Sequence, residues 1–408
     1  MTYLQKAIPA NQYPFKKEKA LDATGHTVDA LDLSEANLTH CDVEIDENYN
    51  QEFVLSNEKV NEILCHEDDT NKQSNYTEEY CKCVLVTGGV GFVGSHIAEA
   101  LLKEGRKVVV YDIFNSETTS SKEKVENAEI LRMTAKKNAS IGASISIIDG
   151  DIRDQDKVIQ VVKEFKVTGV IHVGGMVDDR ASVKHPEVFI DVNIRGTAML
   201  LDALGKCGVK MVVQASTRSV FGQRLDNSEK LNEHADRRPI NPYGASKVGA
   251  DAMAHCYCHL HGMNLTLVRI FATYGPRGRP DMIPRILIEN IVNDKPIHKF
   301  GTGDATRTWI YISDVVAAFL VALKHPQDGY AEFNTGAPNS TTLNELIRCG
   351  EEVTGKKAII EHCPVPPGDA HTVGHPSYDH IKHVLGWEPK ITVKEGMRLT
   401  YEDYMKRF

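Results

Sequence analysis

The chain has 408 residues, of which 25% are charged and 41% are apolar, a composition typical of a globular protein with a sizeable core. Its charge is uneven: residues 1–80 contain 17 acidic residues and 6 lysines, whereas the rest contains 39 acidic and 41 basic residues. Because the body is nearly neutral, nucleic acid is excluded as an expected partner.

Residues 1–80 show no sustained apolar periodicity, so we expect an acidic, flexible N-terminal extension. No apolar run resembles a signal peptide or approaches the roughly 18 residues of a membrane helix. Nine cysteines, an odd number, favour free thiols in a reducing compartment. We therefore predict a cytoplasmic protein with no membrane partner. The two C-x-C pairs lack the further ligands of a zinc site, so we predict no metal.

From residue 81 onward, short apolar runs alternate with helix-length segments. The strand candidates are 83–88, 107–112, 145–151, 169–175, 210–216 and 265–271. Continuous apolar runs are typical of strands covered on both faces. The pattern therefore predicts an α/β fold, with a Rossmann-type doubly wound parallel sheet over 81–272. Beyond 272, Gly and Pro become frequent. We assign 273–408 mainly to a smaller C-terminal substrate-binding lobe, with some segments returning to the first domain.

The stretch VLVTGGVGFVGSHIAEALLKEG places Gly88, Gly91 and Gly94 directly after a predicted strand and at the start of a helix. In a dinucleotide-binding turn, such glycines permit the tight turn, the approach of the pyrophosphate and close helix packing. The next predicted strand ends at Asp112, 18 residues after Gly94. A carboxylate there would hold the adenosine ribose hydroxyls and repel a 2′-phosphate. The pattern predicts NAD, because a turn made for packing alone does not account for Asp112.

The stretch NPYGASKVGAD begins a helix and places Tyr243 and Lys247 four residues apart on one face. An ammonium beside a phenol would lower the phenol pKa from about 10, so that Tyr243 could act as base and acid near neutral pH. The same spacing also occurs on ordinary surface helices. Thr217, at the carboxyl end of a predicted strand, favours the catalytic interpretation, because open α/β sheets bind ligands at that edge.

In chain order, the segments TGGVGFVGSH, GDIRD, VIHVGG, STRSVFG, NPYGASK and RTWIYISDV resemble the NAD-dependent epimerase/dehydratase family, extended short-chain dehydrogenases/reductases that act on nucleotide sugars. The resemblance covers residues 81–408. It implies NAD as cofactor, a UDP-sugar substrate, and Thr217, Tyr243 and Lys247 as the catalytic residues. It also implies a homodimer formed through the Tyr243 helix and the helix near 187–206.

The resemblance implies positions for further residues around the two ligands. Along NAD these are Phe92 and Val93 at the pyrophosphate, Asp151 and Ile152 beside the adenine, and Asn193 and Phe271 at the nicotinamide. Around the substrate they are Arg307 at the UDP phosphates, Asp369 near the uridine ribose and Arg279 at a sugar carboxylate.

The loop TYGPRGRPDM, residues 273–282, favours one subfamily. It resembles a stretch that marks the UDP-glucuronate 4-epimerases. The 4,6-dehydratases carry Asp-Glu where this chain has Arg218-Ser219, and the UDP-glucuronate decarboxylases end the tyrosine helix differently. Pro276 and Pro280 are expected to stiffen the loop. Arg279 matches the carboxylate ligand of the subfamily, and Arg277 is expected to be a solvated charge.

Several positions depart from the usual family residues. Ala272 replaces a Thr that helps hold the carboxylate, and Gly174-Gly175, Arg218 and Phe221 replace Ala-Ala, Ser and Tyr. Asp178 and Asp179 stand where small residues are usual. These acids would repel a carboxylate substrate unless Arg180 or Arg218 pairs with them, so Arg180 is a further candidate at the substrate.

We therefore predict an NAD-dependent isomerase that epimerises C4 of a UDP-sugar, converting UDP-glucuronate to UDP-galacturonate through a transient 4-keto sugar. The alternatives are a UDP-glucose 4-epimerase and a UDP-glucuronate decarboxylase. An alternative of another class is a non-catalytic NAD-binding sensor or scaffold, against which the intact Thr217, Tyr243 and Lys247 count.

Overall fold

The computed structural model describes residues 82–114, 121–223, 230–364 and 374–407, together with residues 20, 21, 27 and 28. In the N-terminal unit, Met1–His66, the described elements are two short antiparallel strands, β1 (Ala20–Leu21) and β2 (Thr27–Val28). The rest of the expected acidic extension lies outside the described residues. The account below concerns the second compact unit, Glu67–Phe408.

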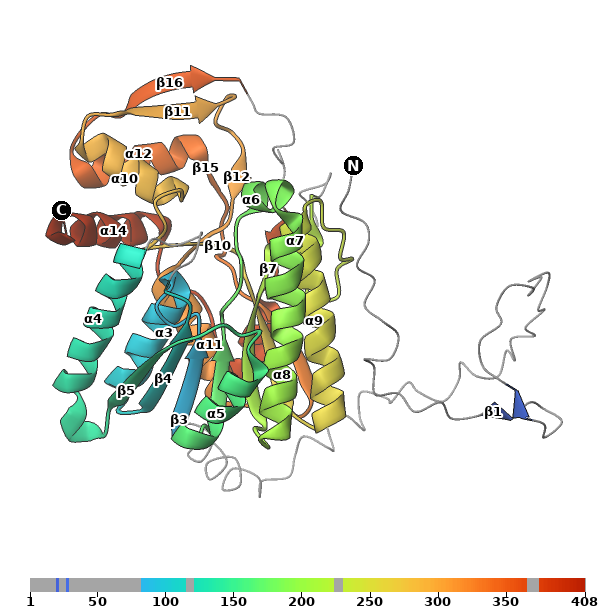
Figure 1. Ribbon diagram of the computed structural model, residues 1–408. Helices are drawn as coiled ribbons and strands as arrows, with labels where there is room; N and C mark the ends of the chain where they lie inside the picture. The colour runs from blue at the N-terminus through green and yellow to red at the C-terminus, as the bar shows by residue number, and fades with distance from the viewer. Residues whose placement is uncertain are drawn as a thin grey trace, which may run out of the picture. The chain divides into compact units, whose positions relative to one another are not determined.

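A seven-stranded, wholly parallel sheet forms the centre of this unit, in the order β14-β9-β7-β6-β3-β4-β5 (Figure 1). Its strands are β3 (Cys83–Thr87), β4 (Lys107–Asp112), β5 (Ser144–Asp149), β6 (Gly169–His172), β7 (Met211–Thr217), β9 (Asn264–Ile270) and β14 (Tyr330–Asn334). The strand order reverses between β3 and β6, which is the switch point of a doubly wound sheet. The prediction of a Rossmann-type α/β fold is therefore confirmed.

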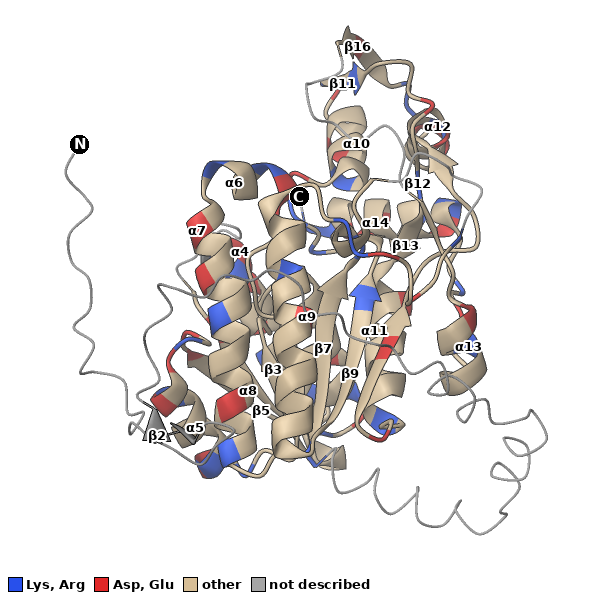
Figure 2. Cartoon of the chain, turned by 90° about the vertical axis from the view of Figure 1, so that its right-hand side faces the viewer, with Lys and Arg blue, Asp and Glu red and all other residues tan. Residues whose placement is uncertain are grey.

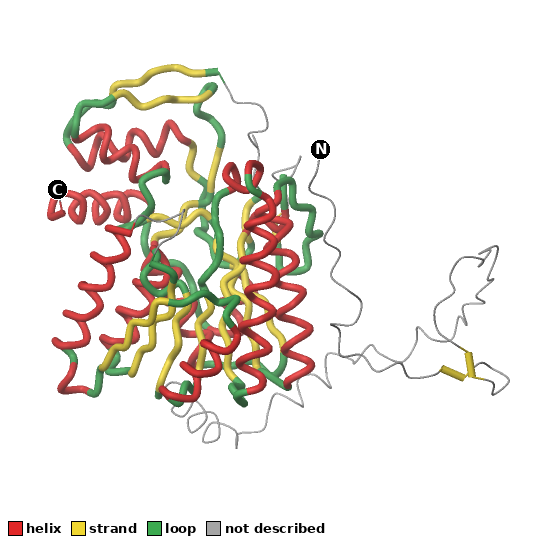
Figure 3. The backbone as a smooth tube through the Cα atoms, viewed as in Figure 1, coloured by secondary structure: helices red, strands yellow, loops and turns green. Residues whose placement is uncertain are grey.

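Helices cover both faces of the sheet, as Figure 3 shows. One face carries α3 (Phe92–Lys103), α4 (Ser121–Lys137) and α11 (Ile312–Lys324); the other carries α5 (Gln155–Phe165), α8 (Thr197–Lys206) and α9 (Pro242–His261). Alternate residues of a strand point to opposite faces. Accordingly Val84 and Val86 belong to the first core, and Cys83 and Leu85 to the second. Burial on both faces explains why these strands read as continuous apolar runs.

A second group of elements lies beyond the carboxyl ends of the strands (Figure 2). It contains α10 (Ile283–Val292), α12 (Leu343–Thr354), α14 (Val393–Arg407) and the parallel pair β11 (Pro296–Phe300) and β16 (Ile359–Cys363). Its apolar side chains, including Leu287, Leu346 and Met397, join the core that covers the α3 face of the sheet. This packing fixes the group over the edge where ligands bind in such sheets.

Shorter elements complete the unit. The helical ones are η3 (Ala139–Ile141), α6 (Asp179–Lys184), α7 (Pro186–Phe189), the π-helical η4 (Ile190–Gly196), η5 (Arg218–Phe221) and α13 (Asp379–Leu385). The strands are β8 (Lys230–Leu231), β10 (Ala272–Tyr274), β12 (Thr306–Arg307), β13 (Trp309–Tyr311), β15 (Thr341–Thr342) and β17 (His375–Pro376).

All six predicted strands form, within a few residues of their expected ends. The seventh, β14, lies in the part of the chain assigned mainly to the second lobe, yet it pairs with β9 along the sheet edge. Its sequence, YAEFN, is short and half polar. One of its polar residues, Glu332, forms an ion pair with the buried Arg269, with 2.6 Å between Oε2 and Nη2. The strand therefore lacks the continuous apolar run by which the other strands were recognised.

Candidate active site

A cavity of about 470 Å³ opens at the carboxyl ends of the strands, next to the switch point. It is lined by residues from the glycine turn, from the ends of β4, β6 and β7, from α9 and from the loop that carries Arg279. The predicted site residues among its lining are Gly88, Gly91, Phe92, Val93, Gly94, Asp112, Asp151, Ile152, Thr217, Tyr243, Lys247, Phe271 and Arg279. Residues far apart in the sequence thus meet in one place.

The glycine turn has no room for side chains at two positions. Gly88 has φ +66°, and a Cβ there would lie 2.8 Å from the backbone of Gly174. A Cβ on Gly94 would lie 2.1 Å from the carbonyl oxygen of Gly88. Gly91 is the N-cap of α3, which has neither a side-chain cap nor an acidic residue in its first turn. The first N–H groups of this helix are therefore available to an anion.

Asp112 ends β4 inside the cavity, and its two carboxylate oxygens have different partners. Oδ2 accepts a hydrogen bond from the backbone N–H of Val90 at 3.0 Å, which fixes the carboxylate to the glycine turn. Oδ1 accepts from the buried Lys124 ammonium at 2.9 Å. Lys124, which reaches the cavity from α4, was not among the predicted site residues. No local pattern in the sequence signals this contact, because it depends on how α4 packs beside the end of β4.

Asn193 does not line the cavity, although its neighbour Val192 does. Its side-chain amide accepts from the Met176 N–H at 2.8 Å and donates to the Met176 carbonyl at 3.0 Å. It also donates to the Ser246 hydroxyl at 2.9 Å. Since Asn193 is 2% exposed, the structure places it behind the wall, where it joins the Met176 segment to α9.

His172 lies under the glycine turn and is fully enclosed. Its Nδ1 lies 2.7 Å from the Thr87 hydroxyl, and its Nε2 lies 3.1 Å from the Thr197 hydroxyl. Burial, followed by the nearby Lys247 charge, lowers the pKa of His172 to about 3. The ring is therefore neutral at physiological pH and serves as a hydrogen-bonded link between β3 and α8.

Thr217, Tyr243 and Lys247 come together as the sequence predicted. Thr217 ends β7, Tyr243 lies in the first turn of α9, and the two side chains are hydrogen-bonded. The expected lowering of the phenol pKa is wrong for the protein without ligands. Burial raises the pKa of Tyr243 to about 12 and outweighs the Thr217 hydrogen bond and the nearby guanidiniums of Arg279 and Arg218.

The position of Lys247 explains part of the difference between the expected, lowered pKa of Tyr243 and its raised pKa. Its ammonium donates to the carbonyl of Ala215 at 2.8 Å, so it is directed at the strand backbone rather than at the phenol alone. Burial lowers the pKa of Lys247, and the Asp251 charge one turn further along α9 opposes this. Asp251 itself accepts from the Ser216 hydroxyl at 2.8 Å.

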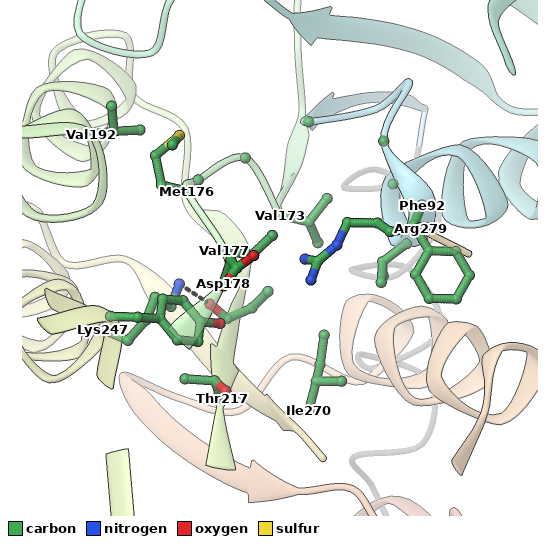
Figure 4. A pocket seen from close by; sticks show the side chains of 18 of the residues that line it. Phe92, Val173, Met176, Val177, Asp178, Val192, Thr217, Lys247, Ile270 and Arg279 are labelled. Atoms are coloured by element: carbon green, nitrogen blue, oxygen red, sulfur yellow. Dashed lines mark hydrogen bonds between the residues drawn. The ribbon is translucent and has the colours of Figure 1, made fainter. Parts of the chain in front are cut away.

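Arg279 extends into the cavity from the side of Phe92 and directs its guanidinium toward the wall that carries Thr217 and Lys247 (Figure 4). It also forms a fork with Asp281, with Nε–Oδ1 at 2.9 Å and Nη2–Oδ2 at 2.8 Å. Burial lowers the pKa of Arg279, but the Asp281 carboxylate more than offsets this, so the group stays charged. A guanidinium has five N–H donors, and this fork leaves others for a ligand.

Arg277 is not the solvated charge that was expected. Its side chain is 5% exposed; Nη2 donates to Glu99 at 2.6 Å and Nε donates to His96 at 3.2 Å. The reason is the backbone: Arg277 has φ +60°, which turns its side chain away from the cavity and onto α3. The two arginines of the loop therefore face opposite ways.

Two other predicted substrate residues, Arg180 and Arg307, lie outside the cavity lining. Arg180 is exposed on α6. Arg307, in β12, donates to the Thr306 carbonyl at 2.9 Å and lies close enough to Arg218 to lower the pKa of that group. Asp369 lies outside the described residues.

The acidic pair at the sugar end of the cavity is partly engaged in local structure. Asp178 caps α6 by accepting from the N–H groups of Arg180 at 2.8 Å and Ala181 at 3.0 Å. It does so with φ +128°, a left-handed conformation in which a non-glycine residue is strained. Asp179 accepts from the Ser219 hydroxyl at 3.4 Å. Both line the cavity.

The donor set fits NAD. The uncapped N-terminus of α3 suits a pyrophosphate, Asp112 suits a ribose diol, and the cavity continues from there to Tyr243. A doubly wound sheet with such a turn and a Thr-Tyr-Lys group at its carboxyl edge defines an NAD-dependent oxidoreductase-type site.

The chain belongs to the NAD-dependent epimerase/dehydratase family, whose sequence profile matches residues 84–336. A UDP-glucuronate 4-epimerase of Thermodesulfobacterium geofontis is 34% identical over 318 residues, which are 78% of this chain and 94% of that protein. The family, NAD as cofactor and the isomerase class are confirmed.

Solved structures agree with this assignment. A UDP-glucuronic acid 4-epimerase from Bacillus cereus, in complex with UDP-glucuronic acid and NAD, is 27% identical, with a TM-score of 0.72 over 80% of this chain and 100% of that one. A UDP-glucose 4-epimerase from Thermotoga maritima with UDP-glucose is 29% identical, with a TM-score of 0.71 over 80% and 99%.

The described residues show no sign of a membrane span or of a metal site. None of their helices is both long and apolar enough to span a membrane. Among the same residues, no group of three His, Cys, Asp or Glu side chains suits a metal ion. The six described cysteines form no disulfide.

Proposed function

We propose that the protein epimerises C4 of a UDP-hexuronic acid, interconverting UDP-glucuronate and UDP-galacturonate. The observation that carries the proposal is the Arg279 guanidinium, which extends into the cavity close enough to Tyr243 to lower its pKa. An arginine beside the proton-transfer group suits a sugar with a carboxylate next to the reacting carbon. C5, which bears the carboxylate, is bonded to C4.

Tyr243 is the group that takes the proton from the O4 hydroxyl and returns it. Thr217 orients the phenol and can share the substrate oxygen through a hydrogen bond. NAD, when bound, accepts the hydride from C4 and returns it to the opposite face. Between the two transfers the planar 4-keto sugar must turn over within the cavity.

The phenol must lose its proton despite its raised pKa. Arg279 and Arg218 oppose the effect of burial on Tyr243, and the Lys247 ammonium lies one turn further along the same helix. Residues that hold these charges near the phenol therefore help proton transfer as well as binding.

The oxidised uronate is a β-keto acid, which loses carbon dioxide when its carboxylate turns out of the plane of the ring. A planar guanidinium that holds both carboxylate oxygens resists this rotation. Arg279 therefore has two roles in the proposal: it selects the charged sugar and it suppresses decarboxylation.

The proposal is tested by incubating the NAD-loaded protein with UDP-glucuronate and with UDP-glucose, and by identifying the products by NMR and mass spectrometry. Expected is UDP-galacturonate without accumulated NADH. A UDP-4-ketopentose with release of NADH, or a UDP-pentose with NAD regenerated, would instead indicate a decarboxylating enzyme. Bound NAD with no conversion of any UDP-sugar would favour the sensor.

A neutral-hexose epimerase is the second candidate, and two observations favour it. Ala272 offers no hydroxyl to a carboxylate, and the Arg279 fork is engaged by Asp281. Proteins named as UDP-glucose 4-epimerases are also among the relatives, such as one from Oryza sativa that is 29% identical over 77% of this chain and 87% of that protein. Preference for UDP-glucose in the same assay would select this candidate.

We also propose a homodimer in the cytoplasm, with the C-terminal lobe supplying most of the substrate contacts. Large apolar side chains that are exposed on or beside the helices expected at the interface, Val183, Ile190, Ile240 and Leu260, support the dimer. Light scattering coupled to size-exclusion chromatography tests it. Asp369 remains a proposed contact to the uridine ribose.

A further inference from the structure

Arg218 directly follows Thr217, as the first residue of the short helix η5. It therefore projects from the same strand end that supplies the partner of the Tyr243 phenol. Arg218 lines the cavity. The resemblance described above implies a Ser at this position in the family, so this chain carries a long cation where a short hydroxyl is expected.

The charge of Arg218 is poorly compensated by the protein. No hydrogen bond or ion pair joins its guanidinium to any residue that the structure describes, in contrast to the Arg279 fork and the Arg277–Glu99 pair. Burial lowers the pKa of Arg218, and Asp179 is the first nearby acid that opposes this. A half-buried guanidinium that lines a cavity and has free donors is suited to bind an anionic ligand.

The position of Arg218 identifies the part of the substrate that it faces. Tyr243 and Thr217 define where O4 of the sugar must lie, and Arg218 is adjacent in sequence to Thr217 and near enough to influence the phenol. A group on C5 is the nearest substituent to O4 that can carry a negative charge. Arg307, expected at the phosphates, lies near enough to Arg218 to lower its pKa.

We propose that Arg218 is a specificity-determining residue that binds the carboxylate of the sugar, so that the carboxylate lies between Arg218, at the start of η5, and Arg279, on the loop 273–282. This inference rests on the proposed uronate substrate and deepens it. Two guanidiniums compensate for Ala272 and for the repulsion by Asp178 and Asp179. They also hold the carboxylate from two sides, which restrains its rotation.

The test compares full-length, NAD-loaded wild type with Arg218→Ser, which installs the usual family residue, and with Arg218→Lys, which keeps the charge but not the fork. Arg132→Ser, on the exposed face of α4, is the matched control. Binding of UDP-glucuronate and UDP-glucose is measured by calorimetry, and products are identified by NMR. Thermal melting and NAD content verify that each variant is folded.

We expect Arg218→Ser to weaken UDP-glucuronate binding by about 10- to 100-fold, the range for a charge-assisted hydrogen bond, while UDP-glucose binding changes by less than about threefold. Arg218→Lys should lie between, and pentose product should increase in both variants. Equal losses for the two sugars, or no loss, would overturn the proposal. If Arg218→Ser fails to fold, the selective loss in Arg218→Lys decides.

The same measurements separate this inference from the proposed function. A wild type that does not epimerise UDP-glucuronate, but loses affinity for it selectively on Arg218→Ser, disproves the epimerisation and supports Arg218 as the carboxylate ligand. A wild type that epimerises UDP-glucuronate with an unaffected Arg218→Ser variant supports the function and disproves the role of Arg218.

Discussion

The cavity has two halves that are built differently. The cofactor half consists of backbone and small residues: the glycine turn, the uncapped N-terminus of α3 and one carboxylate, Asp112, at a strand end. The sugar half contains charged side chains from separate elements: Arg218 in η5, Asp179 at the start of α6 and Arg279 on a loop. In the cofactor half, ligand recognition depends mainly on the backbone. In the sugar half, it depends on side chains, which a single substitution can replace.

The difference between the two halves indicates which residues determine sugar specificity. A backbone cradle cannot be altered without altering the fold, so it suits a cofactor that is the same throughout a family. Side-chain charges can change while the sheet is maintained, so they suit a sugar that differs between subfamilies. We expect substitutions in the cofactor half to change cofactor binding, and substitutions in the sugar half to change sugar preference.

The largest effect is expected where the halves meet. Tyr243→Phe removes the proton carrier and keeps the ring, so turnover should fall by 10²–10⁴-fold, the usual contribution of a general acid–base group. Bound NAD, measured by its release on denaturation, should be unchanged. A turnover within about tenfold of wild type would contradict the assignment.

Within the sugar half, Arg279→Ala should slow UDP-glucuronate epimerisation by about 10- to 100-fold, as expected for the loss of a charge-assisted pair, and should yield some decarboxylated pentose product. Arg279→Lys should restore part of the rate, because an ammonium lacks the planar fork. Product analysis by NMR checks both outcomes.

Arg277→Ala is the matched variant on the same loop. Because Arg277 faces Glu99 and His96, its loss should lower the free energy of unfolding by about 2 kcal/mol and should change the rate far less than Arg279→Ala does. Urea unfolding measures the first effect. If Arg277→Ala impairs catalysis more than Arg279→Ala, the opposite orientations of the two arginines have no functional meaning.

In the cofactor half, Asp112→Ser should shift relative affinity from NAD toward NADP by about tenfold, because a ribose acceptor and a repulsive charge are both removed. The freed Lys124 ammonium, now 2.9 Å from Asp112, would become available to a 2′-phosphate. Fluorescence titration with both cofactors measures the shift. In the double variant with Lys124→Ala the gain toward NADP should disappear.

The smallest effect concerns stability in acid. His172 is neutral in the folded protein with a pKa of about 3, whereas an unfolded histidine has a pKa near 6.5. Between these values the unfolded chain binds more protons, so stability should fall as the pH drops below about 6.5. Urea midpoints at pH 7 and pH 5 measure this. In His172→Asn the difference between the two midpoints should shrink; an unchanged difference would assign it to other groups, such as His96.

The sequence predicted the cofactor half well because its signals are local. Gly88, Gly91 and Gly94 lie within seven consecutive positions, and the strand patterns that frame them depend on burial alone. The contacts of Asp112 with Lys124 were not predictable, because they depend on how α4 packs on the sheet.

The sugar half was predicted less well, because its contacts also depend on how distant parts of the chain pack. Resemblance placed Arg279 at the substrate. Sequence spacing, however, predicts neither the paired hydrogen bonds from Arg279 to Asp281 nor the orientation of the Arg277 side chain toward α3. Asn193 was expected at the nicotinamide and instead supports the wall, because its amide satisfies the Met176 backbone. β14 escaped recognition because its polar residue serves an ion pair in the sheet.

The buried Arg277–Glu99 pair joins the loop 273–282 to α3, the helix that begins at the glycine turn. Lifting that loop would separate two charges and expose an enclosed guanidinium, so the loop is anchored to the cofactor helix rather than free to act as a gate. Arg277→Ala should therefore speed amide hydrogen exchange at Gly278 and Met282, whose N–H groups donate to the carbonyls of Gly275 and Arg279. The arginine that faces away from the cavity thus helps to hold Arg279 in place.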